Sequence, residues 1–202
     1  MEIFNKITSF FQAIVNFINS WIRGLLQTPK VTNKSTAKNN PEITGEIEKI
    51  IKDIGIEILG SLDFTARTKE ALKVLRLTQS FREIKPYVSI IKEAQRSGMQ
   101  VYGEKPTYEV GEKTWNHSVA WYASTIIHDG YHSKLYHEAK AKNNGNEPSP
   151  EIWSGTKAEK NCLKFQLKAL EELKADEYII NYIKKEIENP TYHLVPYEER
   201  NW

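Results

Sequence analysis

The chain has 202 residues, 40% of them hydrophobic and 27% charged, which is enough to bury one good core and excludes wholesale disorder. The 28 Lys and Arg residues nearly balance the 26 Asp and Glu residues, and the two signs are interleaved, so the charge pattern predicts no nucleic-acid partner. The single cysteine, Cys162, excludes an internal disulfide. It stands in a helical pattern beside Leu163, where we expect a buried structural thiol.

The N-terminal residues 2–26 predict an amphipathic helix with a broad aromatic face. Polar residues interrupt the apolar stripe too often for a membrane span, and the segment lacks the apolar centre and cleavage site of a signal peptide. Three roles stay open for residues 3–25: packing on the main domain, pairing with a partner helix, or lying on a membrane surface. The sequence therefore leaves the cellular location open.

The chain divides into three parts by composition. Residues 1–27 form the predicted N-terminal helix, and residues 28–40 are polar, without apolar periodicity, and read as a linker. Residues 41–202 form the main domain, for which the pattern predicts a predominantly helical α+β fold.

Within the main domain, helical periodicity alternates with one short β-prone stretch. There is no Gly-rich phosphate loop and no regular alternation of strands and helices, so the pattern argues against a doubly wound nucleotide-binding fold. The β-prone runs MQVY and TYEV predict two short strands or one edge hairpin. The predicted helices are residues 42–62, 65–84 with Thr65 as a cap, 85–98, 116–142, 156–173 and 176–188, with a loop at 143–155 and an irregular tail.

The stretch HDGYH, within the predicted helix 116–142, contains the candidate metal-binding and catalytic residues. His128 and His132 stand four residues apart, so one helix face presents both imidazoles, which zinc accepts readily. Asp129 follows the first histidine, where the motif HExxH has a glutamate that accepts a proton. The apolar segment before His128 indicates that this histidine starts from a buried turn and needs a partner. The motif therefore predicts a metal site.

A third ligand is needed, and Glu159 on the next predicted helix is the candidate. His137 is a rival, but five residues after His132 the helix has turned about 140° away from that face. Glu138, one residue further, also points off the face.

The stretches WYASTIIHDGYHSKLY and WSGTKAEKNCLKFQLKAL resemble the zincin metallopeptidases, and most of all their two-histidine, one-glutamate branch, the gluzincins. The resemblance covers roughly residues 105–173. It implies a zincin-like domain in which zinc is held by His128, His132 and Glu159, with Asp129 as general base. The implied activity is hydrolysis of a peptide or protein substrate.

The resemblance also implies a short edge strand, just before the active-site helix, that holds the substrate. TYEV stands there, which makes Tyr108 and Val110 the expected substrate-binding residues. The chain departs from the family motif at Asp129, where aspartate retracts the carboxylate by about 1.5 Å relative to glutamate. The candidates for a transition-state donor, each with an equally good structural explanation, are Tyr131, Tyr136, His117 and His193.

Two other interpretations stay open. The adjacent pair His128-Asp129 also looks like the HD-domain phosphohydrolases, with His117 and Asp176 as further ligands, although that family places its first histidine further upstream. The chain can instead be a non-catalytic helical interaction module in which the histidine pair merely packs. A bound metal with an open coordination position would argue against that third interpretation.

Overall fold

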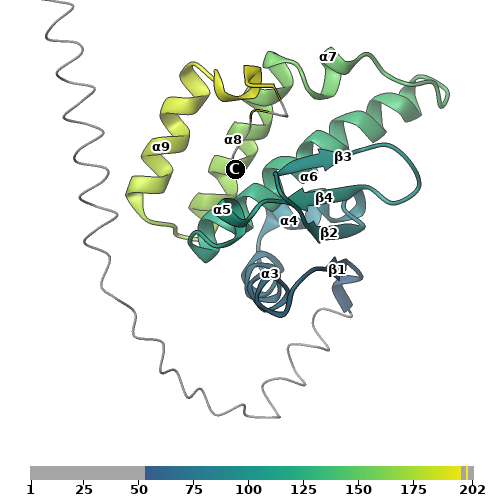
Figure 1. The fold of residues 1–202 in the computed structure, drawn as a ribbon. Helices are drawn as coiled ribbons and strands as arrows, with labels where there is room; N and C mark the ends of the chain where they lie inside the picture. The colour runs from purple at the N-terminus through teal and green to yellow at the C-terminus, as the bar shows by residue number, and fades with distance from the viewer. Residues whose placement is uncertain (1–52, 197–198, 200–202) are drawn as a thin grey trace, which may run out of the picture. The chain divides into compact units, whose positions relative to one another are not determined.

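The protein is described by a computed structural model that covers residues 53–196 and residue 199. The predictions for residues 1–27 and 28–40, and for the first residues of the main domain, lie outside this range. Within it the fold is α+β and mostly helical, with one small sheet, as the sequence predicts (Figure 1).

The sheet has four strands in the order β1-β2-β4-β3. β1 (Glu57–Leu59), β2 (Ile90–Glu93) and β4 (Thr107–Val110) run parallel, and β3 (Gly98–Gln100) pairs antiparallel with β4. The predicted hairpin is confirmed, because β3 and β4 lie at the positions of MQVY and TYEV. The prediction that TYEV is an edge strand is wrong.

β4 lies between β2 and β3, pairing parallel with the first and antiparallel with the second. Tyr108 and Val110 are both fully buried, and Tyr108 is paired with Ile91 on one side and Met99 on the other. The edge strands of the described sheet are therefore β1 and β3. Any substrate contact by the side chains of Tyr108 and Val110 would require this core to open.

Among the helices around the sheet, three confirm the predicted helices 116–142, 156–173 and 176–188. Ser118 begins the longest helix by accepting a 3.2 Å hydrogen bond from the backbone N–H of Trp121. The helices are α3 (Leu62–Leu75), α4 (Gln79–Ile84), α5 (Glu112–Trp115), α6 (Val119–Lys142), α7 (Pro150–Trp153), α8 (Thr156–Glu172) and α9 (Glu177–Glu188), with short 3₁₀ turns at Lys85–Tyr87 and Tyr192–Leu194.

Two Ile-rich segments predicted as helices contain strands instead. In the predicted helix 42–62, Gly55 adopts φ +72°, which stops the helix, and the chain continues as β1. The predicted helix 85–98 is a 3₁₀ turn followed by β2, because Ile90 and Ile91 are β-branched and β2 pairs between two other strands.

The predicted helix 65–84 is two helices. Ser61, and not Thr65, caps the first, since its Oγ accepts from the backbone N–H of Phe64. Thr78 caps the second in the same way, accepting from Phe81 at 3.1 Å. The chain turns between the two helices, and the continuous hydrophobic periodicity of the sequence gave no sign of this break.

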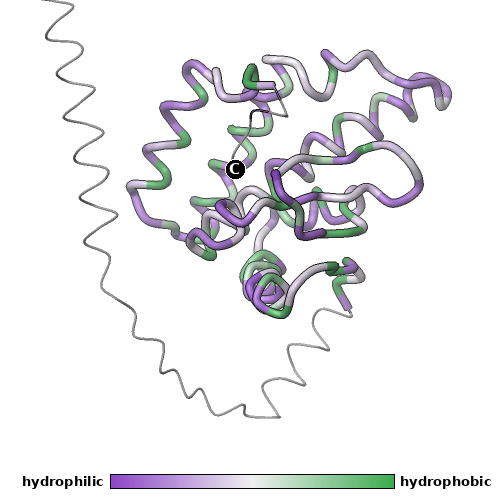
Figure 2. Tube along the Cα trace, viewed as in Figure 1, coloured by the Kyte–Doolittle hydropathy of each residue, from purple (hydrophilic) through white to green (hydrophobic). Residues whose placement is uncertain are grey.

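The core forms where α6 contacts α3, α4 and α8. The main cluster of buried side chains runs from the sheet through α3 and α6, and a second cluster of Leu163, Leu170, Ile179 and Ile183 joins α8 to α9. Figure 2 shows apolar and polar positions alternating along these helices, as one-sided burial requires. Among the described residues, no helix has the length and apolar character needed to cross a membrane.

Gly130, in the middle of the HDGYH motif, lets α6 approach α4 closely. A Cβ atom at this position would lie 2.9 Å from Ile84 Cδ1 and 3.0 Å from Val88 Cγ2. Ile84 is fully buried and Val88 nearly so, which leaves little room for either to move. The glycine therefore sets how α6, and with it the histidine pair, sits on the core.

Candidate metal centre

The two histidines of HDGYH project from one face of α6. His128 and His132 are one helical turn apart, so their rings lie side by side. Their Nε2 atoms are 3.1 Å apart, and each residue is only 8% exposed. The helix thus offers two ligand nitrogens within a buried space.

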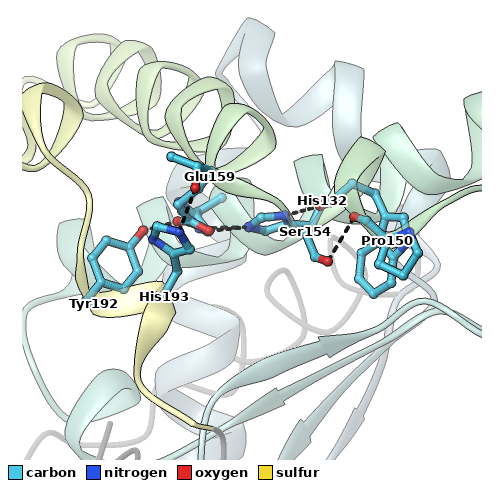
Figure 3. A network of polar contacts seen from close by, with 9 residues as sticks. His132, Pro150, Ser154, Glu159, Tyr192 and His193 are labelled. Atoms are coloured by element: carbon cyan, nitrogen blue, oxygen red, sulfur yellow. Dashed lines mark hydrogen bonds and ion pairs between the residues drawn. The ribbon is translucent and has the colours of Figure 1, made fainter.

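Glu159 reaches this pair from the first turn of α8. Its Oε1 atom lies 3.0 Å from His128 Nε2 and its Oε2 atom lies 3.3 Å from His132 Nε2. The residue is only 4% exposed, and Figure 3 shows its carboxylate turned toward His132. α8 packs along α6, which brings the three predicted ligands together although a loop and a short helix separate them in sequence.

A backbone carbonyl fixes the orientation of His132. The Nδ1 atom of His132 donates to the carbonyl oxygen of Trp153 at 2.6 Å, since a carbonyl can only accept. Nδ1 therefore carries a proton, and Nε2, which faces His128 and Glu159, is the nitrogen left to bind a metal when the ring is neutral. Metal-bound histidines commonly have their other ring nitrogen held in this way. Trp153 belongs to α7, inside a segment predicted as a loop.

Tyr192 contacts the same carboxylate from the C-terminal segment. Its hydroxyl donates to Glu159 Oε1, and Figure 3 shows Tyr192 and His193 on one side of the carboxylate and His132 on the other. Burial and the Glu159 charge raise the pKa of Tyr192, so the hydroxyl keeps its proton and remains a donor. Sequence reasoning missed this residue, because an irregular tail gives no signal of where it folds back.

Cys162 also belongs to this cluster. It is fully buried one turn beyond Glu159 on α8. The donor atoms of His128, His132 and Cys162 all lie within 4.8 Å of one another. The prediction of a buried thiol is confirmed, but its neighbours were not foreseen. The i, i+3 spacing of Glu159 and Cys162 was the available signal.

Opposite charges hold the cluster together when no metal is bound. Burial alone would raise the pKa of Glu159, but the adjacent His128 and His132 hold it well below its usual range. Burial alone would lower the pKa of His132, whereas contacts with Cys162 and Glu159 raise it well above the usual value. Burial raises the pKa of the Cys162 thiol, and the neighbouring His132 opposes this shift. Without a metal, protons take the place of the cation.

Asp129 is partly exposed on α6, beside His128. After burial, the Asp129 charge is among the causes that raise the pKa values of Tyr108, Tyr192 and Cys162. Its carboxylate is therefore close enough to act electrostatically on residues of β4, the C-terminal segment and α8. Two of these three residues, Cys162 and Tyr192, also belong to the group of side chains around His128, His132 and Glu159.

The alternative ligands proposed from the sequence lie at other places in the fold. His137 stacks on Tyr87 with ring centroids 6.3 Å apart, and Glu138 accepts from the same tyrosine, so both face away from the cluster. His117 precedes α6, and His128 lies about two and a half turns into that helix, so His117 does not join the pair as the HD-type arrangement requires. Asp176 stands at the start of α9.

Of the candidate transition-state donors, His193 alone lies beside Glu159 in Figure 3, and its Nε2 is 3.3 Å from Thr156 Oγ1. Tyr131 packs against Phe165 with ring centroids 4.5 Å apart, and Tyr136 donates to Glu147.

Comparisons of this chain with protein-family models, with curated proteins and with solved structures find no match.

Proposed function

We propose that this chain is a zinc-dependent hydrolase that cleaves peptide bonds. The observation that supports it is the spacing of three buried donor groups. Zinc with tetrahedral bonds of about 2.0–2.1 Å to nitrogen and oxygen separates its ligand atoms by about 3.3 Å. The two Nε2 atoms are 3.1 Å apart, Glu159 Oε1 lies 3.0 Å from His128 Nε2, and Glu159 Oε2 lies 3.3 Å from His132 Nε2. The carboxylate thus presents one oxygen to each histidine, and the spacing of the three side chains is close to what a shared zinc ion requires.

The surrounding residues suit this role. Trp153 orients His132 through its carbonyl, and Tyr192 holds Glu159. A zinc ion bound here would act as a Lewis acid and lower the pKa of water. Asp129 is the proposed proton acceptor, on the same helix and next to a ligand, with an arm one methylene shorter than the glutamate of HExxH.

A peptide substrate is favoured by the edge of the sheet. β3 is antiparallel to β4, contacts α6 and has no strand beyond it in the described sheet. An open edge can hold an extended peptide through backbone hydrogen bonds. The resemblance to gluzincins, with HDGYH on one helix and Glu159 on the next, points to the same substrate class. The strand proposed to bind substrate is thus Gly98–Gln100 and not Thr107–Val110.

The test is cleavage of a mixed peptide library by the zinc-loaded full chain and by Asp129→Asn. We expect cleavage by the parent and a loss of about 100-fold or more in rate for the variant, since a general base typically contributes that much. The matched control is Glu138→Gln, a carboxylate on the same helix that faces away. Zinc-loaded protein that leaves every peptide intact, or an Asp129→Asn variant as fast as Glu138→Gln, would overturn the proposal.

A further inference from the structure

We propose that Cys162 is a fourth protein donor of the metal centre, which makes the centre selective for thiophilic metals. The inference rests on the proposed metal site. It adds a ligand that the two-histidine, one-glutamate motif does not contain.

Cys162 and Glu159 are three residues apart on α8, so both side chains project toward α6 from successive turns. His128 and His132 project back from α6 in the same way. Two helices thus each contribute two donors to one small volume, with two imidazoles facing a carboxylate and a thiol. Tetrahedral zinc takes four such ligands.

The distances allow the thiol to bind. Zinc bonds of about 2.3 Å to sulfur and 2.0–2.1 Å to nitrogen place the two ligand atoms about 3.5 Å apart. The donor atoms of Cys162, His128 and His132 lie within 4.8 Å of one another. The sulfur therefore needs to move by roughly 1 Å at most to complete the set, which a change in its χ1 angle supplies.

Burial places the sulfur among the candidate ligands, where it interacts with His132. Cys162 is fully buried, and its charged neighbours are His132, Glu159 and Asp129. Binding to a divalent cation exchanges the thiol proton for the metal: the S–H bond breaks, the sulfur–metal bond forms with the sulfur electron pair, and the proton leaves to solvent.

A thiolate changes which metals the site selects. Sulfur ligands favour Zn²⁺, Cd²⁺ and Cu⁺, whereas Mg²⁺, Ca²⁺ and Mn²⁺ favour oxygen. The thiolate also competes with water for the fourth position, which is open in catalytic zinc sites and closed in structural ones. The resting centre is therefore closed by Cys162, and hydrolysis requires water to displace the sulfur.

The test is the absorption spectrum of the full chain titrated with Co²⁺, compared with Cys162→Ser and Cys162→Ala. Cobalt gives visible bands wherever it binds and a near-ultraviolet charge-transfer band only when a thiolate is a ligand. We expect both bands in the parent, and the loss of the near-ultraviolet band alone in both variants. We also expect Cd²⁺ affinity to fall on the order of tenfold in Cys162→Ser, with Mn²⁺ affinity changing much less.

The outcomes separate the two proposals. Visible cobalt bands without a near-ultraviolet band in the parent would overturn the role of Cys162 and leave the three-ligand site standing. A parent chain that binds no cobalt at all would overturn the metal site and the fourth ligand together. Because the decisive spectrum is that of the parent chain, the test does not depend on the folding of either variant.

Discussion

The Nδ1 atom of His132 donates to the carbonyl oxygen of Trp153 across 2.6 Å, so a residue of α7 determines which nitrogen of His132 faces Glu159. The side chain of Trp153 anchors α7 at this place. Its ring packs edge-on against Tyr102 and Tyr136, with ring centroids 5.9 and 5.7 Å apart. The short helix thus positions a residue of the candidate metal centre, although it supplies no candidate ligand.

Replacing Trp153 with alanine removes this anchor and loosens the carbonyl that holds His132. We expect zinc affinity to fall by about tenfold, as is usual for groups that orient a metal ligand, while the stoichiometry stays the same. Competition with a chelating dye measures the affinity. The control is Ile152→Ala, at the neighbouring half-exposed position. Equal affinities for the two variants would show that α7 does not position His132.

Tyr192→Phe removes the hydroxyl that donates to Glu159 and keeps the ring. The freed carboxylate oxygen loses its orientation, so we again expect a loss of about tenfold in zinc affinity. Tyr178→Phe is the matched control, because Tyr178 is 73% exposed on α9. If Tyr192→Phe binds zinc as tightly as Tyr178→Phe, the C-terminal segment has no part in the centre.

Metal binding should release protons at neutral pH. Burial lowers the pKa of His132, but Cys162 and Glu159 raise it well above the usual value, so the metal-free ring is protonated at neutral pH. Zinc binds only the neutral ring, and its apparent affinity should therefore increase as pH rises, by up to about tenfold per pH unit for each proton released. Calorimetric titration in two buffers of different ionisation enthalpy counts these protons. A titration with no proton release would contradict the assigned charges.

The stability of the metal-free chain should change with pH in the opposite sense. A group whose pKa is raised in the folded state stabilises that state fully below its unfolded pKa, about 6.5 for histidine. The contribution of His132 is therefore lost as pH rises through its raised folded pKa. Urea unfolding in the presence of a chelator measures the effect, and His132→Ala should remove it. An unchanged pH dependence in that variant would contradict the pairing.

Gly130→Ala tests how closely α6 approaches α4. Helix propensity alone would stabilise the variant by about 1 kcal/mol. The added Cβ atom would lie 2.9 Å from Ile84 Cδ1, and such overpacking costs about 1–3 kcal/mol, so we expect net destabilisation in urea. The double variant Gly130→Ala, Ile84→Val removes the clashing methyl and should recover part of the loss. A single variant more stable than the parent would contradict this packing.

The proximity of His128, His132 and Glu159 was predictable because helical spacing fixes which side chains share a face. The interval between His128 and His132, and an acid early on the following helix, are local signals that need no knowledge of the rest of the fold. The residues that orient His132 and Glu159 have no comparable signal in the sequence. Trp153 acts through a backbone carbonyl, which any residue possesses, and Tyr192 lies in a tail without periodicity.

The sheet was the least predictable part of the fold. The segments of β1 and β2 are short and rich in isoleucine, and a short apolar run fits a buried strand or a buried helix equally well. Pairing decided the outcome, since Ile91 lies opposite Ile58 on one side and Tyr108 on the other. The same pairing placed β4 inside the sheet and left β3 at its edge.

The central claim is that α6 and α8 together hold one zinc site. The most direct measurement is metal content per chain by mass spectrometry, on the full chain and on His128→Ala, Glu159→Ala and the control His137→Ala, whose ring stacks on Tyr87 outside the cluster. The account predicts stoichiometric zinc in the parent and in His137→Ala, lost in the other two variants. A parent chain that stays metal-free after zinc is supplied would contradict it, and would favour a helical interaction module in which HDGYH only packs.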